Sequence, residues 1–333
     1  MIRTGFQGTI GQTPLIELPK LSAAIGRRLV GKAEFLNPGG SVKDRAARGI
    51  IEDAERRGAL ARGGTIVEGT AGNTGIALAL LGNARGYRTI ICIPDDQSEE
   101  KYALLRAFGA DVRIIPAAPY TNDDNYYHVA RRTAVEIPGA FWADQFNNVA
   151  NRLAHYTTTG PEIWAQTEGT LAAFVAAAGT GGTLAGTSMA LKERNPKIRA
   201  VLNDPYGSAL YSHVKCGTLE VEGDSNAEGV GIKRIVANFD GAPVDDAIRT
   251  DDRTMVEMAH WLVREEGLFL GGSAALNVAG AARYARTLPE GSVVATILCD
   301  GGERYRSRLY NRAWLEENDC VPTANDLSFL TAP

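Results

Sequence analysis

The stretch from residue 65 to residue 94 reads TIVEGTAGNTGIALALLGNARGYRTIICIP. An apolar run at residues 65–68 is followed by a glycine-rich turn, by a helix expected over residues 76–85, and by a second apolar run at residues 89–94. Runs that are apolar throughout are typical of strands buried on both faces, and helices between such strands are typical of a parallel sheet. The stretch therefore predicts a β-α-β unit.

The same order of strand, turn and helix recurs along the rest of the chain. The first series continues beyond residue 94, and a second series begins near residue 172. Two such series predict two α/β domains with mostly parallel sheets and a cleft between them, where ligands bind at the carboxyl ends of the strands. The further expected elements are helices over residues 98–108 and 183–194 and strands over residues 111–115, 172–178, 198–202 and 292–299.

Composition and charge exclude several classes of protein. Apolar residues make up 44% of the 333 residues, which suffices for a large core, and the net charge of −4 offers no basic excess for nucleic acid or anionic lipid. No apolar run reaches the roughly 18 residues of a membrane span, and the N-terminus lacks the apolar region of a signal peptide. Widely spaced cysteines predict free thiols, buried at two positions, and a cytoplasmic protein. They are Cys92, Cys216, Cys299 and Cys320, of which Cys92 and Cys299 lie in apolar runs.

The segment Gly179-Thr180-Gly181-Gly182-Thr183 lies between an expected strand and an expected helix. Free backbone N–H groups and the helix dipole favour an anion at such a point, and glycines let the backbone approach it closely. A phosphate is the expected ligand, and a plain tight turn is the alternative. A dinucleotide fits less well, because Leu184 stands where the fingerprint needs its third glycine, although Asp204 could imitate a ribose ligand.

A second turn, residues 37–45, reads NPGGSVKDR and contains a lysine. Ser41 and Asp44 match an aspartate form of the capping box, which predicts a helix with Lys43 in its first turn. A partly buried amine opposed by the helix dipole would have a lowered pKa and would be nucleophilic. On spacing alone, a solvated surface lysine is the simpler interpretation.

The third turn, Thr70 to Gly75, also stands between a strand and a helix. It offers backbone N–H groups to an anion, and Asn73 adds a donor and an acceptor. A substrate carboxylate is a suitable ligand. The alternative is a turn in which Asn73 merely adopts the left-handed conformation.

Together these turns resemble the cysteine synthase branch of the fold-type II pyridoxal-phosphate enzymes, which includes O-acetylserine sulfhydrylase and cystathionine β-synthase. Matching motifs occur in order at residues 11–15, 37–45, 72–76, 145–148, 158–164, 179–183, 271–273 and 302–305. The resemblance implies two three-layer α/β domains of the tryptophan synthase β type. These are a smaller mobile domain at residues 41–150 and a larger phosphate-binding domain from residues 1–40 and 151–322, followed by a polar, poorly ordered tail at residues 323–333.

The resemblance also implies a role for each matching residue, with pyridoxal 5′-phosphate as cofactor and no metal. Lys43 would form a Schiff base with the cofactor and act as the general base. Ser273 would face the ring nitrogen, and because a hydroxyl cannot stabilise a protonated ring as an aspartate does, β-elimination would be favoured over transamination. Asn73 would bind the ring oxygen, and Gly179, Thr180, Gly181, Gly182 and Thr183 the phosphate. The substrate residues would be Thr70, Ala71, Gly72, Asn73, Thr74, Gln145 and Gly229.

The implied reaction is β-replacement on an activated L-serine, in which O-acetyl-L-serine and sulfide give L-cysteine and acetate through an α-aminoacrylate intermediate. Closure of the smaller domain would exclude water. Alternatives within the class are cystathionine synthesis, cysteine desulfhydration, and another β-replacement with a nitrogen or cyanide nucleophile. The alternative from another class is a non-catalytic homologue that binds the C-terminal peptide of serine acetyltransferase. The resemblance also suggests a homodimer.

Two departures from the family pattern bear on the substrate. Ala71 stands where the family usually has serine, so the amino-acid pocket lacks a hydroxyl. Lys233 and Arg234 follow the Gly-x-Gly segment where the common sulfhydrylase has small and aromatic residues. These two charges either face solvent or line the cleft, and in the second case they would favour a more acidic or bulkier partner.

Overall fold

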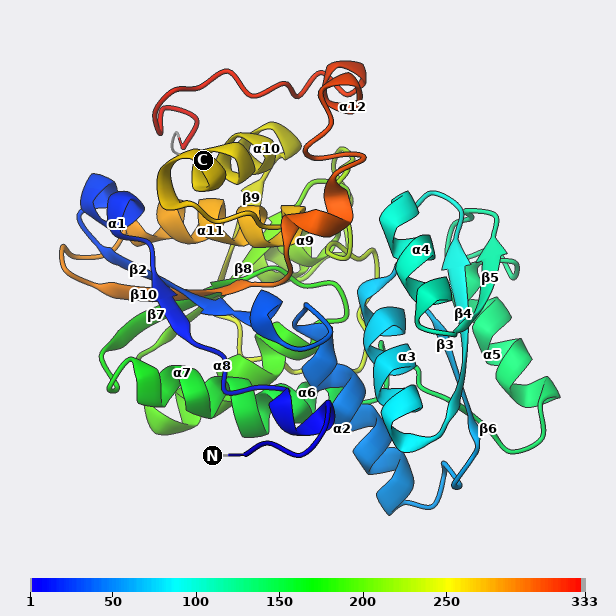
Figure 1. The fold of residues 1–333 in the computed structure, drawn as a ribbon. Coiled ribbons are helices and arrows are strands. Elements are labelled where there is room, and N and C mark those ends of the chain that lie inside the picture. Colours follow the sequence, from blue (N-terminus) through cyan, green and yellow to red (C-terminus); the bar gives the residue numbers. More distant parts are fainter. Residues whose placement is uncertain (1, 331–333) are drawn as a thin grey trace.

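The computed structural model describes residues 2–330, and its strands form two separate sheets (Figure 1). The six-stranded sheet has the order β1-β2-β10-β7-β8-β9, and every neighbouring pair is parallel except β1 with β2. The four-stranded sheet has the order β5-β4-β3-β6 and is parallel throughout. The strands are β1 (Leu15–Glu17), β2 (Arg28–Ala33), β3 (Thr65–Gly69), β4 (Arg88–Pro94), β5 (Asp111–Ile115), β6 (Ala140–Trp142), β7 (Leu171–Ala176), β8 (Arg199–Pro205), β9 (Asp246–Thr250) and β10 (Val293–Leu298).

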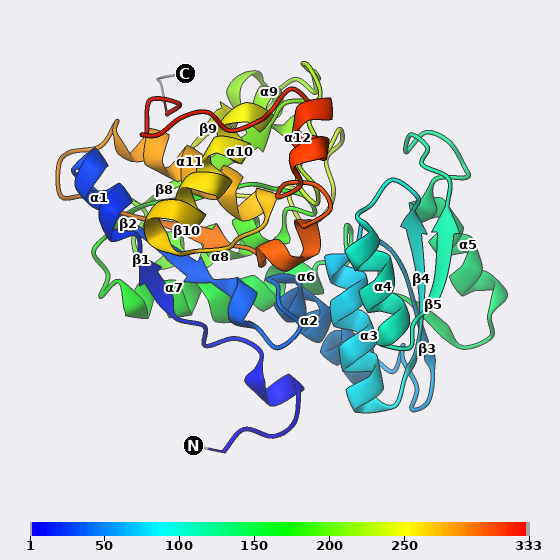
Figure 2. The ribbon, with the colours of Figure 1, turned by 45° about the horizontal axis from the view of Figure 1, so that its top comes forward.

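Helices cover both faces of the four-stranded sheet (Figures 1 and 2). Successive residues of a strand point to opposite faces. Ile91 and Ile93 of β4 therefore pack with α3 and α4, whereas Ile90 and Cys92 pack with α5. This double burial explains why the strand reads as an unbroken apolar run. The helices are α3 (Asn73–Arg85), α4 (Glu99–Ala107) and α5 (Tyr126–Glu136).

The six-stranded sheet is covered in the same way. Ala173 and Val175 of β7 join a core with α1, α10 and α11, whereas Phe174 and Ala176 join a second core with α7, α8 and α9. Helix α2 packs against α3 of one domain and α6 of the other. The helices are α1 (Pro19–Ile25), α2 (Lys43–Arg56), α6 (Ala150–Ala154), α7 (Gly160–Gln166), α8 (Gly182–Arg194), α9 (Leu210–Cys216), α10 (Asp252–Trp261), α11 (Gly272–Ala285) and α12 (Arg312–Glu317).

The two α/β domains with mostly parallel sheets are confirmed, while the boundaries at residues 41, 150 and 322 stay a prediction. Each expected strand and helix is present, although α3 begins at Asn73 rather than at residue 76. The sequence reading missed β2, whose centre holds Gly31 and Lys32. Lys32 is fully buried there because its amine pairs with Glu162 over 2.7 Å, a partner that is distant in sequence.

The expectation of a poorly ordered tail does not hold for residues 323–330. The backbone N–H of Thr323 donates to the Glu257 carboxylate over 2.7 Å, and Leu330 is buried in the core beside α10 and α11. Apolar residues at the end of a polar segment thus anchor it. Residues 331–333 lie outside the described part of the chain. Within residues 2–330, no helix has the length and apolar character that a membrane crossing requires.

Candidate active site

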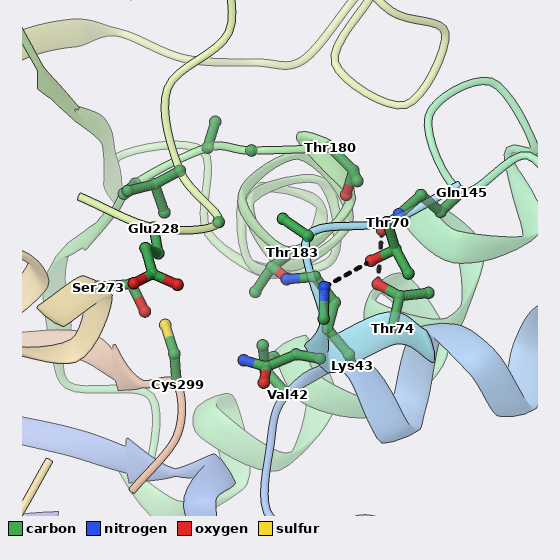
Figure 3. Close-up of a pocket in the computed structure, with 18 of the residues that line it drawn as sticks. Val42, Lys43, Thr70, Thr74, Gln145, Thr180, Thr183, Glu228, Ser273 and Cys299 are labelled. Carbon is green, nitrogen blue, oxygen red and sulfur yellow. Dashed lines mark hydrogen bonds between the residues drawn. The ribbon is translucent and has the colours of Figure 1, made fainter. Parts of the chain in front are cut away.

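A cavity of about 180 Å³ lies between the two sheets. Its walls come from the segments that follow β3 and β7, from the end of β10, and from the starts of α2 and α11. The carboxyl ends of parallel strands open at one edge of each sheet, so turns from both domains meet there. Every predicted site residue lines this cavity except Gly182. In Figure 3, Lys43 lies between Ser273 and Cys299 on one side and Thr70, Thr74 and Gln145 on the other.

Lys43 is the first residue of α2, as the turn before it predicted. The expected capping box is wrong in its details. Ser41 Oγ accepts from the Lys43 backbone N–H over 3.2 Å, but the Asp44 carboxylate accepts from Gly39 N–H over 2.5 Å instead of returning to Ser41. The glycine turn before the helix therefore folds back onto Asp44, which directs Lys43 toward the cavity.

The Lys43 amine faces the cavity instead of bulk solvent, so the surface-lysine interpretation is wrong. Burial lowers its pKa, although the nearby Cys299 and Asp300 act in the opposite direction. Among residues 2–330 no side chain or carbonyl forms a hydrogen bond or ion pair with this amine. A lowered pKa makes an unpaired amine easier to deprotonate, and the deprotonated amine is a nucleophile and a base.

The segment Gly179–Thr183 forms another wall of the cavity, and its last two residues are the first residues of α8. The backbone N–H groups of Thr180, Gly181 and Gly182 have no acceptor within the described residues, as expected at a helix start. These donors and the positive end of the helix dipole make an anion site.

The glycines of this segment are required by packing as much as by a ligand. A Cβ added to Gly179 would lie 2.2 Å from the carbonyl oxygen of Gly229, and one added to Gly182 would lie 2.3 Å from Asn151 Oδ1. Gly181 adopts φ +82, a conformation that side chains disfavour. Gly182 fails to line the cavity because that side of it faces Asn151.

A buried histidine that the sequence reading missed stands behind this wall. His155 Nε2 lies 3.2 Å from Thr183 Oγ1, and its Nδ1 lies 2.9 Å from Thr159 Oγ1. Burial, with the charges of Arg45 and Lys43, lowers its pKa well below the usual value, so the ring is neutral. The signal for this residue lies in the run of threonines around it, which becomes meaningful only once α8 packs alongside.

The turn Thr70–Thr74 is braced by Gln145. Thr74 Oγ1 donates to Gln145 Oε1 over 2.5 Å, and Gln145 Nε2 donates to the Gly69 carbonyl over 3.2 Å. The left-handed residue is Gly72, with φ +133, whereas Asn73 begins α3. The alternative of a left-handed Asn73 is therefore wrong.

Asn73 connects the two domains through its side-chain amide. Its Nδ2 donates to Asp300 over 2.7 Å, and Arg304 donates to its Oδ1 over 2.5 Å. Tyr305 hydroxyl donates to the same carboxylate oxygen of Asp300 over 2.6 Å. An amide has two N–H donors and two lone pairs, so Asn73 keeps one of each for a ligand.

Ser273, the second residue of α11, is buried and lines the cavity beside Cys299. Cys299 follows β10 and accepts from Asn277 Nδ2 over 3.3 Å. Burial raises the pKa of this thiol to about 12, so it is neutral. The expectation of a merely buried thiol is confirmed for Cys92 and incomplete for Cys299, which is half-buried at the cavity wall.

Glu228 and Lys101, which the sequence reading did not single out, also line the cavity. Lys101 forms an ion pair with Glu228, and Arg308 pairs with the same carboxylate over 3.1 Å. The Lys101 stem lies against Gly72. The pair thus joins α4 of the smaller domain to the segment before Gly229.

The dinucleotide alternative fails on geometry. Asp204 is buried outside the cavity, and its carboxylate accepts from the Tyr211 backbone N–H over 2.8 Å. This carboxylate serves the start of α9 and is not positioned to meet a ribose beside Gly181.

Comparison with known proteins places the chain among related enzymes. The family model described as pyridoxal-phosphate dependent enzyme matches residues 6–300. Cysteine synthase 1 of Neurospora crassa is 50% identical over 325 residues, which cover 96% of this chain and 86% of that protein. The cysteine synthase of Dictyostelium discoideum is 47% identical over 340 residues, with 99% and 90% covered. The crystal structure of the O-acetylserine dependent cystathionine β-synthase from Helicobacter pylori has a TM-score of 0.84 and 36% identity, and the match covers 92% of this chain and 98% of that one.

Proposed function

The chain belongs to the family of pyridoxal-phosphate dependent enzymes, and we propose that it converts O-acetyl-L-serine and sulfide to L-cysteine and acetate. The observation that carries this proposal is a complete site in a chain that matches two cysteine synthases over nearly its whole length. The unpaired Lys43 amine, the anion site of α8 and the turn Thr70–Thr74 all face one cavity. A non-catalytic homologue would have no need to keep these groups together.

The cavity fits pyridoxal 5′-phosphate. Free N–H groups at the start of α8 suit its phosphate, the Lys43 amine suits its aldehyde, and the Ser273 hydroxyl offers a hydrogen bond to its ring nitrogen. Asn73, with one N–H still free, suits the ring oxygen. When bound, the cofactor supplies an electron sink for negative charge at the substrate Cα.

Each remaining role falls to a residue of the chain. Lys43, whose pKa burial lowers, takes the proton from the substrate Cα as general base. The N–H groups of Asn73 and Thr74 at the start of α3 bind the substrate carboxylate, and Gln145 holds that turn in place. Closure of the smaller domain on the substrate would exclude water from the cavity.

The two departures in sequence give no reason to expect an acidic or bulky nucleophile. Lys233 is exposed, and Arg234 stacks on aromatic rings, so neither charge lines the cavity. The idea that they select an acidic or bulky partner therefore loses its basis. Ala71 does line the cavity, where its methyl group gives the substrate no hydrogen bond.

Cystathionine synthesis is the second candidate, because the Helicobacter pylori relative carries that name. Purified protein incubated with O-acetyl-L-serine or L-serine, each with sulfide or homocysteine, separates the candidates by mass spectrometry of the products. We expect cysteine from O-acetyl-L-serine with sulfide as the main product. Predominant cystathionine, or turnover equal to that of a Lys43→Ala control, would overturn the proposal.

The compartment, the oligomeric state and a protein partner of the enzyme are inferred from its cysteines and from the family resemblance. Four cysteines without disulfides within residues 2–330 support a reducing compartment such as the cytoplasm. The family resemblance supports a homodimer, and binding of the C-terminal peptide of serine acetyltransferase would place that peptide in the same cleft. Light scattering of the purified protein tests the dimer, and competition of the peptide with O-acetyl-L-serine tests the partner.

A further inference from the structure

Arg234 lies among aromatic rings that belong to a distant part of the chain. Its Cζ is 3.6 Å from the centre of the Tyr120 ring, 5.4 Å from that of Tyr127 and 5.0 Å from that of Phe146. All three distances fall within the range of a cation–π contact. The guanidinium is partly buried, so its attraction to these rings is screened less than at an open surface.

This contact joins the two domains beside the cavity. Tyr120 and Tyr127 belong to the domain of the four-stranded sheet, where Tyr120 precedes α5 and Tyr127 lies within it. Arg234 lies between α9 and β9 of the other domain. Tyr126, the neighbour of Tyr127, lines the cavity, and so does Phe146. On the other side, Gly231 lines the cavity and lies close to Arg234 in sequence. Each partner of the contact is thus attached to a cavity wall.

The aromatic partners are held firmly. Tyr127 is buried, and its hydroxyl donates to Asp144 over 3.2 Å and accepts from Asn147 Nδ2 over 2.8 Å. The Tyr127 ring also packs against Tyr120, with ring centres 5.4 Å apart. Tyr127 therefore gives the guanidinium a fixed ring, and Tyr120, which is 40% exposed, covers the guanidinium from the surface.

The segment that carries Arg234 is attached to the smaller domain at both ends. At its start, Glu228 pairs with Lys101 of α4 (Figure 3 shows Glu228 at the cavity). At its end, Arg234 enters the aromatic rings. Between them, the Gly231 backbone N–H donates to the Ala178 carbonyl over 2.8 Å and the Ile232 N–H donates to Ser208 Oγ over 3.0 Å. The middle of the segment is thus tied to the larger domain while its two ends reach the smaller one.

We propose that Arg234 is a positioning residue. It holds the segment 228–234 and the part of the cavity wall that contains Tyr126 in the closed arrangement that binds the amino-acid substrate. The identity of that substrate rests on the proposed function, whereas the closed arrangement does not. Lys233 supplies a matched control, because it carries the same charge one residue earlier and is exposed.

Hydrogen exchange of the holoenzyme tests the arrangement without turnover. In Arg234→Met, peptides that cover residues 118–128 and 228–234 should exchange about three- to tenfold faster than in the wild type, the factor that a cation–π contact of ordinary strength supplies. Lys233→Met should exchange like the wild type. Equal exchange in Arg234→Met and the wild type would overturn the proposal, even if no cysteine is formed by either.

Kinetics separate positioning from a loss of folded protein. Arg234→Met should raise KM for O-acetyl-L-serine by about three- to tenfold with kcat nearly unchanged, whereas misfolding would lower kcat alone. Tyr120→Phe keeps the aromatic face and should retain the wild-type KM, whereas Tyr120→Leu should behave like Arg234→Met. An unchanged KM in both Arg234→Met and Tyr120→Leu would overturn the proposal. If the wild type makes no cysteine, the proposed function fails while the exchange comparison still decides this inference.

Discussion

The side-chain amide of Asn73 donates to the carboxylate of Asp300 over 2.7 Å, across a sequence separation of 227 residues. Asn73 opens α3 beside the four-stranded sheet, and Asp300 follows β10 of the six-stranded sheet. Tyr305 hydroxyl donates to the same carboxylate oxygen. One fully buried carboxylate therefore holds a residue from each side of the cavity.

Replacing Asp300 by alanine is expected to destabilise the protein by about 1–3 kcal/mol, because the buried Tyr305 hydroxyl and the Asn73 amide lose their acceptor. Urea unfolding measures the change. Asp300→Asn retains an acceptor oxygen and should fall between Asp300→Ala and the wild type. Equal stability of Asp300→Ala and the wild type would show that the link carries no net stabilisation.

Lys43→Ala is expected to abolish the visible absorption of the covalently bound cofactor and to lower turnover by at least about 10²-fold, the lower end of what a general base contributes. Absorption spectra and steady-state rates measure both effects. Lys197→Ala, at an exposed position, should leave both unchanged. A Lys43→Ala protein with the wild-type spectrum would exclude this lysine as the attachment point.

Gly179→Ala should weaken cofactor binding, because the new methyl group would lie 2.2 Å from the Gly229 carbonyl oxygen and must push the anion site out of shape. A destabilisation of about 1–3 kcal/mol should accompany it, as for other overpacked sites. Gly8→Ala is the matched control, since its nearest contact would be an ordinary 3.7 Å. Equilibrium dialysis of the cofactor and thermal unfolding distinguish the two variants.

Arg45→Met is expected to cost about 3–5 kcal/mol, because it leaves the Glu34 carboxylate buried without its partner. Both side chains are completely buried, and Arg45 Nε lies 2.7 Å from Glu34 Oε2. Guanidinium unfolding provides the measurement. The double variant Arg45→Met with Glu34→Leu removes both charges and should recover part of the loss. An Arg45→Met protein as stable as the wild type would contradict the claim that the buried Glu34 carboxylate needs Arg45 as its partner.

Glu162 should make stability depend on pH in the acid range. Burial opposes its ionisation, but hydrogen bonds and charges from Arg45 and Lys32 outweigh burial and lower its pKa to about 2. A carboxyl whose folded pKa is depressed contributes stability above its unfolded pKa, near 4.5, and loses it as the pH falls toward 2. Urea unfolding across this range should show a smaller pH dependence in Glu162→Gln than in the wild type. If the free energy of unfolding changed equally with pH in both proteins, Glu162 would be excluded as the source of the pH dependence.

Local patterns were sufficient for much of the fold and of the site. Apolar runs such as residues 89–94 predicted buried strands, and the glycine-rich turns before α3 and α8 predicted where ligands bind. The turn before Lys43 predicted a helix start, although the partner of Asp44 was wrong. Such features depend on neighbours within a few residues, so they are readable in the chain itself.

Contacts between distant segments were not readable in this way. Lys101 and Glu228 carry no local signal, and the threonines beside His155 become a signal only once α8 packs alongside, because each of these residues gains its role from a partner brought near by packing. Arg234 looked equally suited to solvent or to the cleft, and only the structure placed it against Tyr120.

By itself the sequence determined the type of many elements, because helix starts and strand periodicity are local properties, and its resemblance to a known family implied the cofactor class. The tertiary structure alone decided that Lys43 is a half-buried amine facing the cavity, that Asn73 is tied to Asp300, and that Arg234 joins the two domains. These outcomes depend on how the two sheets and their helices pack around one cavity, since packing sets burial, and burial sets pKa and hydrogen-bond partners.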